Sequence, residues 1–187
     1  LAISIYGVMV CGTIYPILLG GIDLAVGATA AMSGACVVLT IVKMDYSFTG
    51  VILGILFGLA AGVMAGIAHG AIVSNFNVPP FLITLASQNI IYGIAQLLTG
   101  NQVISCLEPA AFTFLGGGRL FGIPFSVCIL VIVALISFWL LNRTIFGRQV
   151  YAVGGNKEAS NLSGVSSKRI TTVSYAISGF TAALAGI

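Results

Sequence analysis

Long, uninterrupted apolar segments are the feature that most constrains how this chain can fold. A transmembrane helix needs about 20 mostly apolar residues, and six segments reach or approach that length. They span residues 2–20, 24–42, 50–70, 80–98, 124–141 and 170–187. Only 6% of the 187 residues are charged, whereas soluble domains carry about 25%. So few charges exclude a water-soluble globule and indicate a polytopic membrane protein.

The apolar segments favour helices over barrel strands. A chain in lipid must satisfy its own backbone hydrogen bonds, which leaves helical bundles and closed barrels. Barrel strands would alternate polar and apolar residues over about ten positions, but here the apolar runs are continuous. We therefore predict an all-α polytopic transmembrane helical bundle of about six spans, with a broken helix near Gly20–Asp23. Residues 1–187 are predicted to form a single transmembrane domain, a fragment whose C-terminal spans are missing.

Charge is concentrated in one polar segment, residues 142–169, which holds five of the seven basic residues and one acidic residue. Basic loops stay in the cytoplasm, so this loop and the Asp23 break are placed on or towards the inner side. Asn156 is a suitable N-cap for a short helix over 157–163, with Glu158 in its first turn and Gly164 as its stop. We interpret this helix as a docking element.

Glycines recur at every fourth position of the third apolar segment. Each four-residue step advances the glycine face by about 40° around a helix, so the glycine groove winds around it. A neighbouring helix can approach closely along such a groove. Packing is therefore the expected role, in a helix near the bundle centre rather than facing lipid. The helix-packing residues are Gly50, Gly54, Gly58, Gly62, Gly66 and Gly70.

Two polar stripes lie inside apolar segments at helical spacing. The first contains Thr29, Ser33, Cys36 and Thr40, and the second contains Thr84, Gln88, Tyr92 and Gln96 with Ser87 and Asn89 beside them. Amides in hydrocarbon need partners, so the stripes form hydrogen bonds between helices or line a polar path. Such a path suits a neutral, hydroxylated solute. The candidate translocation residues are Asp23, Thr29, Ser33, Thr84, Gln88, Asn89, Tyr92 and Gln96.

Asp23 is the only charged residue between Leu1 and Val42. It could cap a second helix beginning at about Leu24, or it could face a pathway, because transporters place their sites at helix breaks. The two roles are compatible. His69, the single histidine, is either a packing residue at the interface or a proton relay. The four cysteines are far apart, so no metal site is expected.

Three sequence motifs resemble one family of transport proteins. They are "GGIDLAVGA" (20–28), "NVPPFLITLA" (77–86) and "FGRQVYAVGGNKEASNLSGV" (146–165), in this order. They resemble the membrane permeases of bacterial ABC importers for ribose, xylose and galactose, along the whole chain. In this family the last motif is similar to the coupling loop that docks on the ATPase. That resemblance maps coupling onto Gly154, Gly155, Asn156, Lys157, Glu158, Ala159 and Gly164.

The resemblance implies a multi-pass subunit of the bacterial inner membrane, surrounded by lipid. Its implied partners are a second permease copy or paralogue, a cytoplasmic ABC ATPase dimer and a periplasmic sugar-binding protein, with no nucleic acid. ATP and Mg²⁺ would bind the ATPase, because this chain has no GxxxxGK[ST] phosphate loop. Ala25 and Ala28 stand where relatives often have Ser, and Ser160 where they have Ala, so ribose itself is not implied as the solute.

Two other function classes fit the sequence less well than an ABC sugar permease. An ion-coupled secondary transporter of a small polar solute would use Asp23 or His69 as its coupling site. Carriers of that kind usually need more charges within the membrane than one aspartate. An intramembrane enzyme would need a nucleophile and a base, and no such pair is recognisable, so no catalytic residues are predicted.

Overall fold

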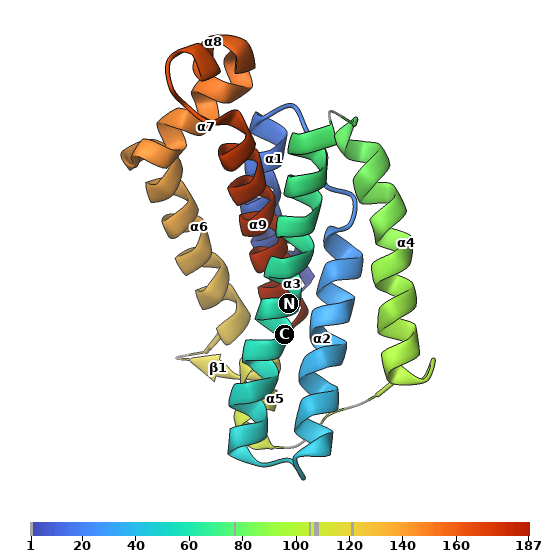
Figure 1. The fold of residues 1–187 in the computed structure, drawn as a ribbon. Helices are drawn as coiled ribbons and strands as arrows, with labels where there is room; N and C mark the ends of the chain where they lie inside the picture. Colours follow the sequence, from blue (N-terminus) through green and yellow to red (C-terminus); the bar gives the residue numbers. More distant parts are fainter. Residues whose placement is uncertain (1, 77, 105, 107–108, 121) are drawn as a thin grey trace.

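The computed structural model describes residues 2–187 apart from 77, 105, 107–108 and 121, and the described chain is mostly helical (Figure 1). Two strands of two residues each, β1 (Arg119–Leu120) and β2 (Ile123–Pro124), pair antiparallel. The predicted all-α bundle is confirmed. The helices are α1 (Ala2–Leu18), α2 (Val26–Lys43), α3 (Phe48–Phe76), α4 (Pro80–Thr99), α5 (Ala110–Gly117), α6 (Phe125–Arg143), α7 (Ile145–Gly155), α8 (Lys157–Leu162) and α9 (Ser167–Gly186).

Each of the six predicted apolar segments corresponds to a helix, and within the described part of the chain four of these helices meet both criteria for a membrane span. By length and hydropathy, α2, α3, α4 and α6 could each cross a bilayer. α1 is apolar but has 17 residues. α9 has 20 residues, several of which carry hydroxyl groups. The expected six spans therefore become four helices that meet both criteria, with α1 and α9 packed among them.

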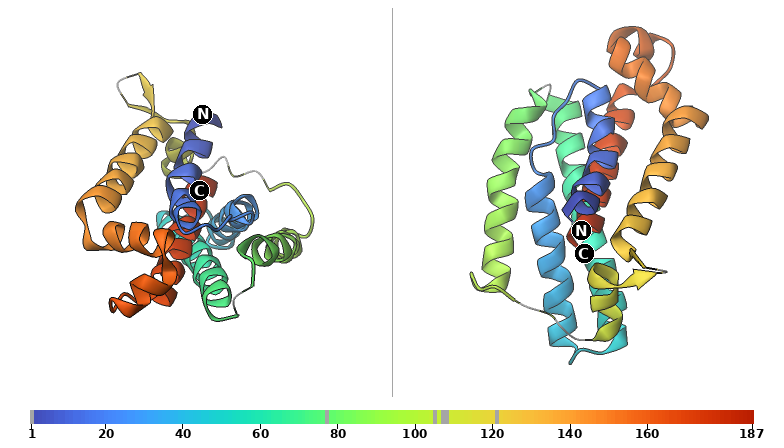
Figure 2. Two further views of the ribbon diagram at one scale, coloured as in Figure 1. Left: turned by 90° about the horizontal axis from the view of Figure 1, so that it is seen from above. Right: turned by 180° about the vertical axis from the view of Figure 1, so that it is seen from behind.

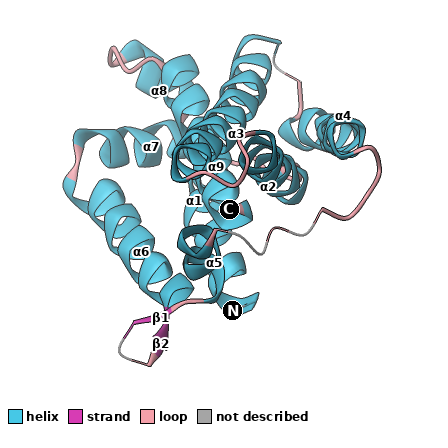
Figure 3. Cartoon of the chain, turned by 90° about the horizontal axis from the view of Figure 1, so that it is seen from below, coloured by secondary structure: helices cyan, strands magenta, loops and turns pink. Residues whose placement is uncertain are grey.

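The centre of the bundle is α9. It packs against α1, α2 and α3, and ten of its residues are buried. Seen from below, α4 and α6 lie at opposite edges of the molecule (Figure 3). α6 buries only Leu141. The most polar of the long helices is therefore enclosed, while the edge helix α6 exposes apolar side chains that suit lipid.

The glycines of α3 bring two other helices into backbone contact. A Cβ atom at Gly54 would lie 2.9 Å from the Val37 carbonyl oxygen of α2. One at Gly62 would lie 2.5 Å from the Gly179 carbonyl oxygen of α9. The glycine face thus passes from α2 to α9 along the helix, as the 40° drift predicts. All six glycines are buried, which supports a role in packing, and that role stays a prediction.

α3 is not, however, enclosed at the bundle centre, so that part of the prediction is wrong for the described chain. Its face opposite the glycines is exposed, with Phe57 at 56% and Met64 at 68%. The reason is that a helix rich in glycine buries one narrow face closely and leaves its large side chains on the other. The hydroxyl-bearing α9 takes the central place instead.

The polar segment 142–169 is more ordered than a loop. Only the short helix near 157–163 was predicted there, yet the structure also has α7. Thr144 caps α7, because its Oγ1 accepts a hydrogen bond from the Gly147 N–H at 3.2 Å. Gly147, Val150 and Val153 recur every third residue and are buried. This apolar face holds α7 against the end of the bundle.

One end of the bundle gathers the elements that matter for function. The α1–α2 connection, the α3–α4 connection, α7 and α8 all lie at this end, and α5 with the two strands lies at the other (Figures 1 and 2). The basic residues of 142–169 belong to the first end. From the positive-inside rule we expect this end to face the cytoplasm, which stays a prediction.

Candidate translocation site at a broken helix

The chain leaves its helical conformation between α1 and α2, as the sequence predicts. α1 ends at Leu18, and Gly20 takes a φ of +77°, which favours glycine. The Pro16 carbonyl accepts hydrogen bonds from the N–H groups of Leu19 (3.1 Å) and Gly21 (2.9 Å). Residues 21–25 then run without helical structure to α2. Irregular backbone at membrane depth is tolerated only inside protein or along a cavity.

Asp23 anchors this break at both of its carboxylate oxygens. Oδ1 accepts a hydrogen bond from the Ala25 N–H at 3.1 Å, and Oδ2 accepts one from the Ser178 hydroxyl at 2.7 Å. α2 begins at Val26, and its N-cap Ala25 makes no side-chain capping bond. The expectation that Asp23 caps a helix starting at Leu24 is therefore wrong. Asp23 closes a turn before the helix, because Leu24 and Ala25 lie between it and the first helical residue, Val26.

Ser178 was missed at the sequence level, although α9 carried a signal. The polar residues Ser167, Thr171, Ser174, Ser178 and Thr181 are spaced 4, 3, 4 and 3 apart, and all are buried. This spacing places them on one helical face. It is the same pattern that identified the stripe in α2. The segment had been interpreted only as an apolar span.

Two further polar side chains share the surroundings of Asp23. His69 of α3 is 4% exposed, and Tyr175 of α9 is 1% exposed. Both interact electrostatically with the Asp23 carboxylate. Tyr175 lies beside the break, because a Cβ at Gly21 would be 2.5 Å from its hydroxyl oxygen. The two roles predicted for His69, packing residue and proton relay, both stay predictions. The structure adds that the Asp23 carboxylate is its neighbour.

α4 contacts the break through Thr84, one of the predicted pathway residues. The Thr84 hydroxyl is within hydrogen-bonding distance of the Ile22 carbonyl at 3.0 Å and of the Pro80 carbonyl at 3.1 Å. Thr84 is fully buried. Its place fixes the start of α4 against the non-helical segment. Asn77, which begins the motif before α4, lies outside the described residues.

The two predicted polar stripes do not form one wall within this chain. In α2, Thr29 and Ser33 are buried, and the Ser33 hydroxyl has no partner among the described residues. In α4, Ile91 packs against Ala25 and Ala28, so an apolar contact separates the stripes. Along α4 the stripe passes from buried to exposed: Thr84 is buried, Gln88 is half-buried, and Asn89, Tyr92 and Gln96 are exposed.

The predicted coupling segment is built as expected at α8. Asn156 is the N-cap, and its Oδ1 accepts a hydrogen bond from the Ala159 N–H at 2.9 Å. Gly164 follows the helix with a φ of +82°. Ser160 is the buried residue of α8, whereas Leu162 is 90% exposed. α8 thus presents an exposed surface at the end of the bundle.

α7 places the coupling segment directly on the end of the broken helix. A Cβ at Gly154 would overlap the carbonyl oxygen of Leu18, the last residue of α1. Gly155, the next residue, has open space around it. α7 is therefore in direct contact with the backbone of α1 two residues before Gly20.

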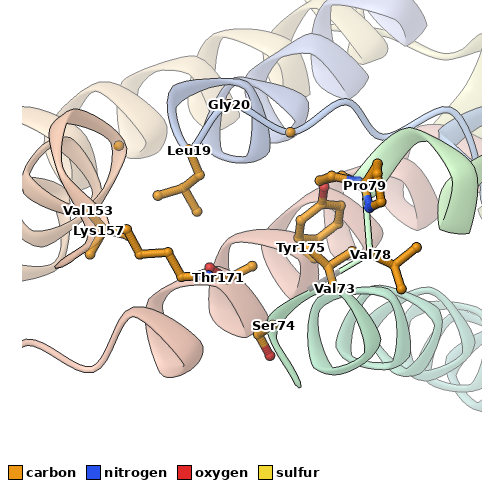
Figure 4. A pocket seen from close by; sticks show the side chains of 13 residues that line it. Leu19, Gly20, Val73, Ser74, Val78, Pro79, Val153, Lys157, Thr171 and Tyr175 are labelled. Carbon is orange, nitrogen blue, oxygen red and sulfur yellow. The ribbon is translucent and has the colours of Figure 1, made fainter. Parts of the chain in front are cut away.

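A cavity of about 400 Å³ lies beside this contact, between the break, the coupling segment and α9 (Figure 4). Residues 19–21 form one wall, and the C-terminal part of α3 and the α3–α4 connection form another. Val153, Gly154 and Lys157 close it on the side of α7 and α8, and Thr171 and Tyr175 on the side of α9. In Figure 4 the Lys157 side chain extends towards Thr171. The volume of this cavity is in the range of small-molecule binding sites.

A polar break inside an apolar helical bundle is typical of membrane transport proteins. The chain belongs to the family described as branched-chain amino acid transport system / permease component, which matches residues 1–187. It is a multi-pass membrane protein. None of the solved structures is significantly similar to it.

Three relatives to which this chain is similar are named as permeases for sugars. The ribose import permease protein RbsC of Bacillus subtilis is 37% identical over 185 residues, covering 98% of this chain and 56% of that protein. The L-arabinose transport system permease protein AraH of Escherichia coli is 35% identical, covering 100% and 56%. The galactofuranose transporter permease protein YtfT of Escherichia coli is 35% identical, covering 90% and 48%. The chain spans roughly half the length of these relatives.

Proposed function

We propose that the protein is the permease subunit of an ABC importer of the bacterial inner membrane, with a monosaccharide or similar neutral solute as its cargo. The observation that carries this proposal is the contact of Gly154 in α7 with Leu18 at the helix break. It joins a cytoplasmic docking segment to the part of the bundle where a solute site is expected. The names of the relatives, which concern ribose, arabinose and galactofuranose, support a sugar.

The solute path is proposed to pass the break and the polar face of α4. Asn89 and Gln96 are exposed there, although amides within hydrocarbon need hydrogen-bonding partners. A path lined by this face, Asp23 and neighbouring hydroxyls would supply those partners as sugar hydroxyls and water. One carboxylate among many neutral polar groups suits a neutral solute better than an ion.

A second permease chain is proposed to complete this path, because α4 lies at the edge of the bundle (Figure 3). Its apolar face contacts α2, whereas its polar face is uncovered by the described chain. Covering that face with another copy or a paralogue would remove the amides from lipid. A periplasmic binding protein would deliver the sugar from the opposite end.

Energy is proposed to come from ATP and Mg²⁺ bound to a separate ATPase dimer, so this chain itself is not an enzyme. The exposed surface of α8, with Glu158 and Leu162, would dock on the ATPase. Closure of the ATPase dimer would displace α8 and α7, and the contact of Gly154 with Leu18 would pass this displacement to the break. The path would then open to the opposite side of the membrane.

An ion-coupled secondary transporter is the alternative, favoured by one observation. His69 and Asp23 lie close enough to interact electrostatically within the bundle, and such pairs occur in proton relays. The two functions differ in their source of energy. A proton-coupled carrier would transport without any ATPase.

Uptake into proteoliposomes distinguishes the two functions. The full-length permease is reconstituted with and without its partner ATPase and ATP, and labelled pentoses, hexoses and nucleosides are offered. We expect uptake only with ATPase and ATP, and the panel identifies the solute. Glu158→Arg should lower ATPase association and uptake by about tenfold or more, as charge reversal at an interface does. Lys43→Glu at the opposite end is the matched control. Uptake driven by a proton gradient alone would overturn the importer.

A further inference from the structure

A second, more polar cavity adjoins the one at the helix break. It has a volume of about 420 Å³ and lies between the end of α3, α8 and the start of α9. Ser74 and Lys157 line both cavities, so the two adjoin at these residues, and together they are called the joined cavity. The outer part adds Lys168 and the amide side chains of Asn75 and Asn161. None of these residues belongs to the proposed sugar path.

The charge of this joined cavity is positive and uncompensated. Lys157 and Lys168 line it, and no acidic residue is among its described lining residues. Lys168 is held in place by a hydrogen bond from its Nζ to the Asn75 Oδ1 at 3.1 Å. Its ammonium has further N–H donors to offer. Two ammonium groups beside amides and hydroxyls are suited to a phosphate group.

The Lys157 side chain points away from the surface of α8 that is proposed to dock on the ATPase. α8 exposes Glu158 and Leu162 at its surface, yet the Lys157 side chain extends towards Thr171 of α9 (Figure 4). This long side chain therefore reaches beneath α8 into the cavity. The Lys157 ammonium is therefore available to a ligand that binds between α8 and the bundle.

The inner part of the cavity suits an organic group. Leu19, Val73 and Val153 give it apolar walls. Tyr175, which is 1% exposed, stands at its inner end, and its hydroxyl has no hydrogen-bond partner among the described residues. A buried hydroxyl without a partner is destabilising. A ligand that brought an acceptor or a water molecule to this end would supply the missing partner.

We propose that this joined cavity binds a phosphate ester at the cytoplasmic end of the bundle. The phosphate lies at Lys157 and Lys168, and the organic part enters the inner cavity. Basic pockets between transmembrane helices bind phospholipid headgroups, and a soluble phosphate monoester offers the same chemistry. A bound ester joins α8 to α3 and α9. It therefore controls how far α8 can move relative to the helix break.

The test uses the purified full-length permease with its ATPase and reads binding, not transport, so its result does not depend on the solute proposed above. Native mass spectrometry measures retention of phosphatidylglycerol from mixed phosphatidylglycerol and phosphatidylcholine. Equilibrium binding of radiolabelled glycerol 3-phosphate is measured in nanodiscs of phosphatidylcholine alone. Retention of the lipid identifies a headgroup as the ligand, and binding of glycerol 3-phosphate identifies a soluble ester.

Two double variants with the same loss of charge make the test specific. Lys157→Gln/Lys168→Gln removes both cavity charges, and we expect about tenfold weaker binding of the probe that the parent protein binds. Arg148→Gln/Arg169→Gln removes two exposed charges on the same segment that do not line the cavity, and binding should stay within about twofold. Equal losses in both variants would show diffuse attraction to the basic surface and overturn the site. Binding of neither probe by the parent protein would overturn it as well.

Discussion

The Ser178 hydroxyl donates a hydrogen bond of 2.7 Å to Oδ2 of Asp23, joining residues 155 positions apart. Ser178 lies on the central helix α9 and is fully buried. Asp23 lies in the break between α1 and α2, where its Oδ1 also accepts the Ala25 N–H. This one carboxylate therefore fixes the non-helical segment to the core of the bundle. A half-buried carboxylate is tolerated there because hydrogen bonds satisfy both of its oxygens.

Removal of the Ser178 hydroxyl should destabilise the protein. Ser178→Ala leaves Oδ2 of Asp23 without its donor, and losing a hydrogen bond to a charged group costs about 1.5–3 kcal/mol. Ser174→Ala is the matched control, because Ser174 is equally buried on the same helix and its hydroxyl has no partner among the described residues. Thermal unfolding of the full-length permease in detergent should show a lower midpoint for Ser178→Ala alone. Equal midpoints for the two variants would show that the bond contributes no stability.

The glycine groove of α3 predicts a contrast between two glycine substitutions. Gly66→Ala places a Cβ atom against the Tyr175 carbonyl and 2.9 Å from the Ala176 Cα of α9. These contacts are backbone, so the helices must separate, at a cost of about 1–3 kcal/mol. Gly93→Ala in α4 meets open space and should stabilise by up to about 1 kcal/mol through helix propensity.

The same unfolding measurement checks both glycine variants. Gly66→Ala should unfold at a lower temperature than the parent protein and Gly93→Ala at the same or a higher one. If Gly66→Ala were as stable as the parent, α3 and α9 would not pack as closely as their backbones do here.

Local signals in the sequence were enough to predict the helix break and α8. Gly20 has the positive φ that its place suggests, and Asn156 and Gly164 bound α8 as expected. The period of the α3 glycines also predicted a groove that winds around the helix. These features depend on residues close together in the sequence, so no knowledge of the fold was needed.

Features that depend on distant segments were not predictable in this way. The partner of Asp23 is on α9, and nothing near residue 23 identifies it. The stripe of α4 looked like one wall, but Ile91 on a neighbouring face set the contact with α2 and left Gln96 exposed. α7 was missed because its glycines, including Gly147, indicate loops until their packing partners are known.

The contact of α7 with α1 predicts that two adjacent glycines differ in their importance for transport. Gly154→Ala adds a methyl group that overlaps the Leu18 carbonyl, whereas Gly155→Ala adds one in open space. We expect Gly154→Ala to slow ATP-driven uptake by about tenfold, because a misplacement of about 1 Å in a coupled element has effects of that order or more. Gly155→Ala should transport within about twofold of the parent.

The readout separates coupling from assembly. ATPase activity and co-purification of the ATPase are measured beside uptake in proteoliposomes. Gly154→Ala should keep the ATPase bound and active while uptake falls. If both variants transported alike, the contact between Gly154 and Leu18 would not transmit the displacement.

The N-cap residue of α8 predicts that Asn156→Ala destabilises this helix, whereas the conservative change Asn156→Asp preserves it. Asn156→Ala removes the oxygen that accepts the Ala159 N–H, and losing such a cap costs a helix about 1 kcal/mol. α8 has only six residues, so it would be unfolded for a much larger part of the time. Asn156→Asp keeps the accepting oxygen and should keep the helix. Hydrogen exchange of the α8 amides and ATPase association, measured on the full-length complex, should both change in Asn156→Ala and return towards the parent in Asn156→Asp. Faster exchange with unchanged ATPase association would mean that α8 forms as described but does not dock on the ATPase.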